Sequence, residues 1–397
     1  MKINNYRFKL KKEHLLIFLL VLPQLKPESL DYISPIFDMA FNIGKIVSFI
    51  VIMLLYLSRR RKPSKIVWMI LALQGWIVIT TYLNKGNIRR AFFSMLFTTA
   101  ILMVIDFFPI KSVIAAMMVN FEWLIYVNLL TLIIFPQGLY RQGVHGEFVD
   151  YFLGFKNSFF SYCVIAILLA ELNFIILGKK IRSIFLMAAS FLNVYIGWSA
   201  SSVVSITIVL LMFLMLIVVK RPKCLTKIKF QQIFVIALTI NILISIFNIA
   251  ERSKLISNFI VNVLHKQTTL SGRTIIWGFA AQMIVRKLII GYGIGEHITW
   301  AGYNWYGHNQ YFEMLLEGGI PCLLLFFLII FTVNKCMKQC KNRLIYDAFI
   351  IVFTGIFIFY LVEAGTGTVF YIMYVLAFHI KDLSILMDQD PVCLNYR

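Results

Sequence analysis

Long apolar runs dominate the chain, and short polar stretches separate them. Most runs approach the ~20 residues that an α-helix needs to cross the hydrocarbon core of a bilayer. Their apolar residues are continuous rather than alternating, so the short alternating strands of a membrane β-barrel do not fit. The pattern therefore predicts an all-α, polytopic integral membrane protein with about 12 transmembrane helices. The runs are residues 14–25, 36–57, 66–83, 91–109, 113–135, 158–177, 184–199, 201–219, 230–250, 318–334, 346–362 and 364–380.

The composition supports a membrane protein and excludes a water-soluble globule. Hydrophobic residues make up 60% of the 397 residues and charged residues 14%, whereas globular proteins average roughly 45–50% and 25%. No internal repeat divides the chain, so we expect residues 1–397 to form a single transmembrane domain. The run at 14–25 is the least secure of the predicted spans because it is short and contains Pro23.

The net charge of +20 fits loops on one side of a membrane. With the N-terminus in the cytoplasm, roughly twice as many lysines and arginines fall inside as outside, and the basic cluster at 59–62 lies inside. The sequence thus predicts cytoplasmic N- and C-termini and basic loops that contact anionic membrane lipids. No nucleic-acid-binding motif accompanies the charge, so no nucleic-acid partner is expected.

Two predicted outer segments are longer than the other connections, namely residues 136–157 and the large loop 251–317. Long loops without an evident scaffold role usually carry function. We therefore expect the site in these two loops, with 251–317 as the catalytic loop before the tenth helix.

The large loop contains an ordered pattern of polar and small residues. Ser271 is the predicted N-cap of an amphipathic helix that ends near Lys287, and Arg273 and Trp277 share one face of it. The sequence Gly-Tyr-Gly-Ile-Gly at 291–295 predicts a turn. A second helix begins near 307 and is expected to lead straight into the tenth span, with His308 and Tyr311 on one face and Asn309, Glu313 and Glu317 on the next.

This order of residues resembles the signature of the O-antigen ligase and O-antigen or capsule polymerase (Wzy-type) superfamily. The shared motif is Ser-Gly-Arg-x-x-x-Trp, then Gly-x-Gly-x-Gly, then His-Asn-x-Tyr-x-Glu-x-x-x-x-Gly-Gly-Ile, within residues 271–321. The resemblance implies a C-type glycosyltransferase in a bacterial cytoplasmic membrane. It implies a metal-independent reaction without a cofactor, with polyprenyl-diphosphate-linked oligosaccharides as substrates on the outer face. The capsular or exopolysaccharide polymerase branch fits better than the ligase branch.

The residue types in the outer loops suit this chemistry. Arginine binds phosphate bidentately and stays charged, and histidine has an ordinary pKa close to neutral, which suits a base that deprotonates a sugar hydroxyl. His308 is the predicted base and Arg273 the predicted diphosphate contact. Glu317 or Glu313 is the alternative base, or the partner that orients His308. The predicted substrate-binding residues are Arg141, Arg252, Arg286, Asn309, Tyr311, Glu313 and Trp277.

Other candidate features of the large loop have plainer interpretations. His265, His297 and Glu296 do not combine with His308 into any standard metal-binding spacing, so no metal site is expected. The aromatic residues at 300–306 fit an interfacial belt better than a platform for sugar rings.

Two alternative functions stay open at this point. A ligase would share the site and transfer the finished glycan to another acceptor. A flippase or transporter of lipid-linked oligosaccharide would use charged residues within the spans, of which Glu122 and Glu171 lie deepest. A polymerase is expected to work beside a flippase and a regulator of chain length.

Overall fold

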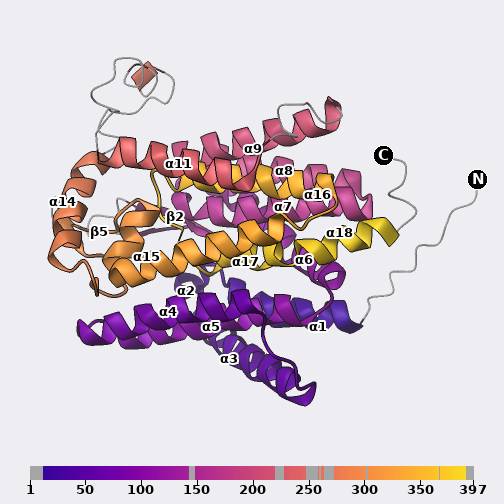
Figure 1. Cartoon of the computed structure of the whole chain (residues 1–397), viewed down its shortest axis with the longest axis horizontal. Coiled ribbons are helices and arrows are strands. Elements are labelled where there is room, and N and C mark those ends of the chain that lie inside the picture. The colour runs from indigo at the N-terminus through magenta and orange to yellow at the C-terminus, as the bar shows by residue number, and fades with distance from the viewer. Residues whose placement is uncertain are drawn as a thin grey trace, which may run out of the picture.

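Helices form most of the molecule and run along one another in a bundle (Figure 1). The computed structural model describes residues 12–142, 148–219, 228–246, 272–300, 303–365 and 367–389, together with positions 258, 261 and 262. The helical content agrees with the predicted all-α class. The helices are α1 (Lys12–Val21), α2 (Leu30–Ile33), α3 (Pro35–Ser58), α4 (Lys65–Leu83), α5 (Ile88–Phe107), α6 (Ile110–Ile134), α7 (Phe159–Leu177), α8 (Lys180–Gly197), α9 (Ala200–Val218), α11 (Phe230–Ser245), α14 (Arg273–Arg286), α15 (Gln310–Met337), α16 (Arg343–Phe359), α17 (Thr368–Phe378) and α18 (Ile380–Gln389).

Seven helices in the described part of the chain are long and apolar enough to cross a membrane. The count rises to eight if α17 and the first part of α18, which are bent by 55° at their junction, form one crossing. The chain is therefore a multi-pass membrane protein, and the count of about 12 stays a prediction. Helix α1 has ten residues and rises only about 15 Å, half of a hydrocarbon core roughly 30 Å thick. A 3-10 turn that contains Pro23 follows it at Leu22–Leu25.

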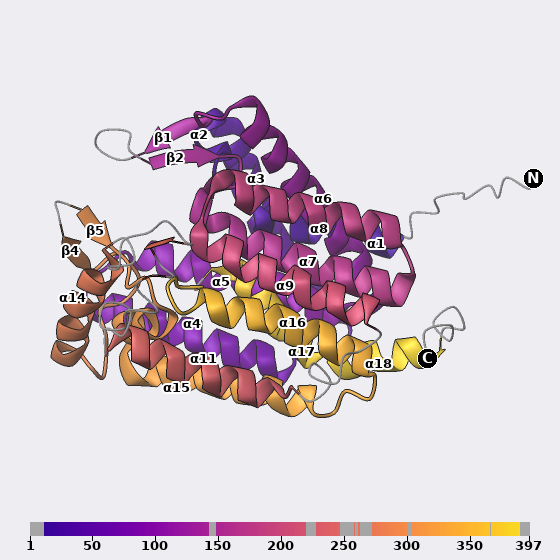
Figure 2. The same cartoon turned by 90° about the horizontal axis from the view of Figure 1, so that it is seen from above.

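Two small antiparallel sheets lie in the loops and were not predicted. In the segment 136–157, β1 (Tyr140–Gln142), β2 (Phe148–Tyr151) and β3 (Gly154–Phe155) form a sheet in that order, and β4 (Ile298–Trp300) pairs with β5 (Tyr303–Trp305) in the large loop. Strands of two to four residues are too short for an alternating pattern to reveal. We call the end of the bundle that carries α14 and both sheets the loop end. Helices α1 and α18 lie at the opposite end (Figures 1 and 2).

Helix α15 is broken near its start, where the sequence predicts a helix that leads straight into the span. It begins at Gln310 rather than near 307, and Gly319 inside it has φ 65° and ψ −159°, which is not helical. Neighbouring backbone supplies the hydrogen bonds that the break removes. The Tyr292 N–H donates to the Leu316 carbonyl (2.6 Å), and the Ile320 N–H donates to the Leu288 carbonyl (2.9 Å). The break thus joins α15 to the loop after α14.

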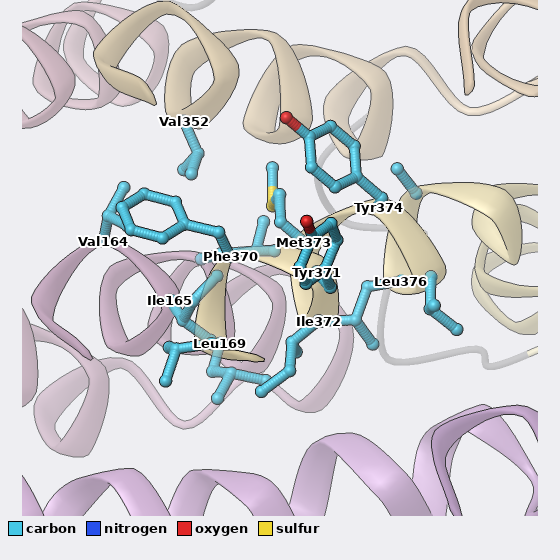
Figure 3. Packing of buried hydrophobic residues seen from close by; sticks show 14 of the residues in the cluster. Val164, Ile165, Leu169, Val352, Phe370, Tyr371, Ile372, Met373, Tyr374 and Leu376 are labelled. Carbon is cyan, nitrogen blue, oxygen red and sulfur yellow. The ribbon is translucent and has the colours of Figure 1, made fainter. Parts of the chain in front are cut away.

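Helix α17 lies in the centre of the packing and fixes the chain just before it. It is apolar on every side and is buried from Val369 to Ala377, as expected for a helix enclosed by others. Figure 3 shows Phe370 beside Val164 of α7, while Tyr371 and Tyr374 point elsewhere around the helix axis. Packing on all sides therefore fixes the position of α17 from its first turn onward.

Candidate active site at the loop end

A polar cavity of about 320 Å³ opens at the loop end of the bundle. Helices α4 and α17 each pack against both α5 and α15, so α5 and α15 face each other across it. Direct hydrogen bonds reinforce this arrangement, with Thr98 of α5 bonded to Thr368 of α17 (2.7 Å) and Gln74 of α4 donating to the Tyr371 hydroxyl of α17 (3.1 Å). The lining residues are Gln74, Ile77, Arg90, Ser94, Ile294, Tyr306, His308, Glu313, Glu317, Glu363, Ala364 and Gly367.

His308 is held in a fixed orientation at the edge of this cavity. Its backbone adopts the left-handed conformation (φ 43°), which costs energy for a residue other than glycine and often marks a functional position. The Trp277 indole N–H donates to the His308 carbonyl (3.3 Å), and the Trp305 ring lies 5.9 Å from the imidazole ring. Nδ1 of His308 lies 2.9 Å from Oε2 of Glu363. With Nδ1–H donating to the carboxylate, Nε2 is the nitrogen that can accept a proton.

Glu363 is the central charge of the site, and the sequence interpretation did not assign it a role. Its Oε1 accepts from the Arg273 guanidinium and from the Asn157 amide (2.9 Å), while Oε2 faces His308. Burial by itself would raise the pKa of Glu363. The charge of Arg273 and the hydrogen bond from His308 outweigh burial and lower the pKa to about 2. Glu363 is thus an anion that binds a histidine and an arginine at the same time.

Arg273 is the first residue of α14, and its side chain forms an ion pair with Glu363. The N-cap position belongs to Gly272, which has φ 85° and makes no side-chain cap. The prediction of Ser271 as the N-cap is therefore wrong by one position, and Ser271 itself lies outside the described residues. The predicted end of this helix is confirmed, since α14 stops at Arg286. Because the three residues of this group come from α14, the 303–309 loop and the turn before α17, only the tertiary structure brings them together.

Two buried carboxyl groups form the α15 side of the cavity. Glu313 and Glu317 are one turn apart on α15, and both line the cavity. The Gly307 N–H donates to Oε2 of Glu313 (2.6 Å). The prediction that these glutamates share a face is confirmed. Among the described residues, the carboxylate within hydrogen-bond distance of the His308 ring is that of Glu363 rather than that of Glu313 or Glu317. Glu363 therefore occupies the place expected for Glu317 as the partner of His308.

The glycine turn at 291–295 is confirmed and has a packing reason. Gly291, Gly293 and Gly295 all have positive φ. A Cβ atom on Gly291 would lie 2.7 Å from the Leu316 carbonyl, and one on Gly293 would lie 2.5 Å from the backbone of Thr81. Gly291 and Gly293 leave no room for a Cβ atom because the turn packs directly on α15 and α4 at these two positions.

Three predicted binding residues support the cavity from behind rather than line it. Asn309 caps α15 by accepting from the Tyr311 and Phe312 N–H groups, and its amide donates to Asn241 of α11 (3.1 Å). Tyr311 is buried and packs against Phe326 and Phe327. Trp277 is 1% exposed and holds the carbonyl of His308.

None of the predicted arginines is among the lining residues that the structure describes, and Arg273 reaches the site only through Glu363. Arg141 is exposed on β1 and Arg286 is exposed at the end of α14. Arg252 lies outside the described residues.

Among the described lining residues the arginine is Arg90, which the sequence analysis did not single out. It stands in the first turn of α5 and donates to the Tyr306 hydroxyl (3.3 Å). A basic residue at the predicted outer end of a span is a weak signal, because such residues often contact lipid headgroups.

The two deep charges of the spans differ from each other. Glu122 of α6 forms an ion pair with Arg182 of α8, which gives it a structural partner. Glu171 of α7 is fully buried, and neither of its carboxyl oxygens has a hydrogen-bond partner in the described part of the chain.

A fixed histidine, a carboxylate anion and an arginine beside a polar cavity at one end of a helical bundle are typical of a membrane enzyme rather than a structural protein. Residues 185–327 match the family model described as O-antigen ligase. This region is therefore an O-antigen ligase family domain, and the resemblance seen in the loop motif is confirmed. Members of the family transfer glycosyl groups and act on lipid-linked glycans. No curated protein matches the chain.

The family match covers part of the site. It contains α14, His308 and both glutamates of α15, whereas Arg90 and Glu363 lie outside it. The roles of these two residues rest on the geometry of the cavity.

Proposed function

We propose that the protein is a polysaccharide polymerase that joins polyprenyl-diphosphate-linked oligosaccharide repeat units on the outer face of a bacterial cytoplasmic membrane. The observation that carries this proposal is the His308–Glu363 pair at the edge of the cavity, because it presents a base of fixed tautomer to bound substrate. The loop end is then the outer end, in accord with the basic residues predicted on the opposite side.

His308 is the general base in this proposal. Nε2 takes the proton of an acceptor hydroxyl while the hydroxyl oxygen attacks the anomeric carbon of the donor glycan. Glu363 holds the imidazole through Nδ1 and stabilises the cation that forms, as the buried carboxylate does in catalytic triads. Arg273 keeps Glu363 ionised and in place. The donor needs no general acid for departure because diphosphate is a good leaving group.

The acceptor in this proposal is the terminal sugar of another lipid-linked repeat unit. Carboxyl groups are strong acceptors for sugar hydroxyls. Glu313 and Glu317 place two carboxyl groups in the cavity, on the helix that begins directly after His308. Tyr306 and Trp305 add aromatic surface beside them.

The test is the size distribution of the surface glycan in a strain that lacks the gene. Complementation with the wild type should give a ladder of polymer, while His308→Ala should leave only single lipid-linked repeat units. His14→Ala is the matched control, since His14 lies on α1 at the opposite end and its replacement should leave the ladder unchanged. Protein levels in the membrane must be equal among the variants.

Each other outcome identifies a different function. Long polymer that is not attached to its final acceptor in the deletion strain indicates a ligase. Absence of lipid-linked units from the outer face in the deletion strain indicates a flippase, which should also lose function in Glu122→Gln and Glu171→Gln. A normal ladder with His308→Ala removes His308 as the base and favours Glu317 or Glu313.

A further inference from the structure

The acidic and basic residues that line the cavity belong to helices on opposite sides of it. Glu313 and Glu317 belong to α15, and His308 directly precedes that helix. Arg90 belongs to α5, which faces α15 across the cavity. Among the cavity-lining residues that the structure describes, Arg90 is the one with a permanent positive charge. A multiply charged anion placed in the cavity is attracted toward Arg90 on the α5 side.

Arg273 is poorly placed to receive the departing diphosphate. Its guanidinium pairs with the same carboxylate that binds His308, so the charges of Arg273 and Glu363 offset each other. The shared carboxylate also puts Arg273 on the same side of the substrate as the base. In an inverting displacement, the base and the leaving group must lie on opposite faces of the anomeric carbon. A leaving group opposite His308 points away from Arg273 and toward α5.

Arg90 meets the requirements that Arg273 does not. It lines the cavity from α5, and no carboxylate in the described part of the chain lies within ion-pair distance of it. Its hydrogen-bond partner is the Tyr306 hydroxyl, which accepts from Arg90 and keeps its own proton for another acceptor. Burial raises the pKa of Tyr306, so the hydroxyl stays protonated. The pair presents guanidinium and hydroxyl donors to one anion.

We propose that Arg90 and Tyr306 form the subsite that binds the diphosphate of the lipid-linked donor and stabilises it as it leaves. This assignment rests on the proposed glycosyl transfer. The acceptor oxygen forms a bond to the anomeric carbon while the bond from that carbon to the phosphate oxygen breaks. The electron pair of the broken bond leaves with the polyprenyl diphosphate, where Arg90 offsets the new negative charge. The acceptor proton passes to His308.

The first arm of the test measures anion binding without any reaction. Purified full-length protein in lipid nanodiscs is titrated with inorganic diphosphate, and binding is followed by calorimetry. The wild type should bind, Arg90→Gln should bind at least about tenfold more weakly, and Tyr306→Phe should lie between them. Arg89→Gln is the matched control, because Arg89 has the same charge one residue away and does not line the cavity. It should bind as the wild type does.

The second arm measures transfer from a polyprenyl-diphosphate oligosaccharide. Arg90→Gln should lower the rate about 10²-fold, the loss typical when one donor to a developing anion is removed, while Arg89→Gln stays within about twofold of the wild type. Arg90→Lys, which keeps the charge and loses the planar fork, should recover part of the rate. Equal thermal unfolding of the variants shows that folding is intact.

The outcomes separate this subsite from the proposed function. Wild-type diphosphate affinity in Arg90→Gln, or affinity lost equally in Arg89→Gln, overturns the subsite. Failure of the wild type to bind diphosphate also overturns it. A wild type that binds diphosphate through Arg90 and makes no polymer refutes the polymerase and leaves the anion site in place.

Discussion

Replacement of Glu363 by glutamine tests whether this buried anion holds the site together. The substitution keeps the shape of the side chain and removes the charge that binds Arg273 and His308. The pKa of Glu363 falls from 4.5 to about 2, and at 1.4 kcal/mol per pH unit this difference corresponds to about 3 kcal/mol. This is the free energy by which the folded site, relative to the unfolded chain, favours the ionised form of Glu363 over the neutral form. The variant should therefore unfold more easily at neutral pH.

The pH dependence follows from the sign of this difference. Because the folded pKa lies below the unfolded one, the stabilisation is fully present above about pH 4.5 and is lost as the pH falls toward about 2. The gap in stability between the wild type and Glu363→Gln should be constant from about pH 8 to 5 and should narrow below about pH 4.5. Thermal unfolding of the purified protein in detergent measures it. Glu296→Gln changes an exposed carboxylate of the large loop and is the control. Its stability should equal that of the wild type across the same pH range.

The same variant separates positioning from substrate binding. If Glu363 orients the base, kcat should fall by up to about 10⁴-fold, the loss seen when the carboxylate of a triad is neutralised, with KM changed only slightly. A gap in stability that stays constant down to about pH 3, or a normal kcat in Glu363→Gln, would refute the reasoning.

Two further substitutions test other parts of the structure. Gly319→Ala should destabilise the protein by more than about 2 kcal/mol, because Gly319 has φ 65° and a Cβ atom there would lie 2.3 Å from the Ile289 carbonyl. Gly278→Ala is the control, because a Cβ atom at Gly278 meets nothing within 4 Å. Equal thermal stability of the two variants would contradict the role of the break in α15. Burial raises the pKa of Asp150 in β2 from 3.8 to about 6. The wild type should therefore lose about 1 to 2 kcal/mol of stability as the pH rises from about 4 to 6, because solvent screens part of the effect. Asp150→Asn should remove this loss, and unfolding curves of equal pH dependence for both proteins would show that the carboxyl is not buried as described.

The predicted elements that the structure reproduces depend on local or repetitive features. Apolar runs of membrane length must form helices, because a helix satisfies its own backbone hydrogen bonds within lipid. The C-terminal end of α14 and the turn at 291–295 follow from residues next to them in sequence. The motif around His308 likewise lies within one short segment, so its residues could be recognised without knowledge of the fold.

The sequence by itself therefore determined the class of the protein, the resemblance that the match at residues 185–327 supports, and the segment that carries the proposed base. Only the tertiary structure decided the partners of that base. His308, Arg273 and Glu363 come from three separate segments, and Glu363 lies 55 residues after His308. Arg90 lies 216 residues before Tyr306 and faces the cavity because α4 and α17 hold α5 opposite α15. Such juxtapositions depend on how helices pack, and packing depends on the shapes of many side chains at once rather than on any local pattern.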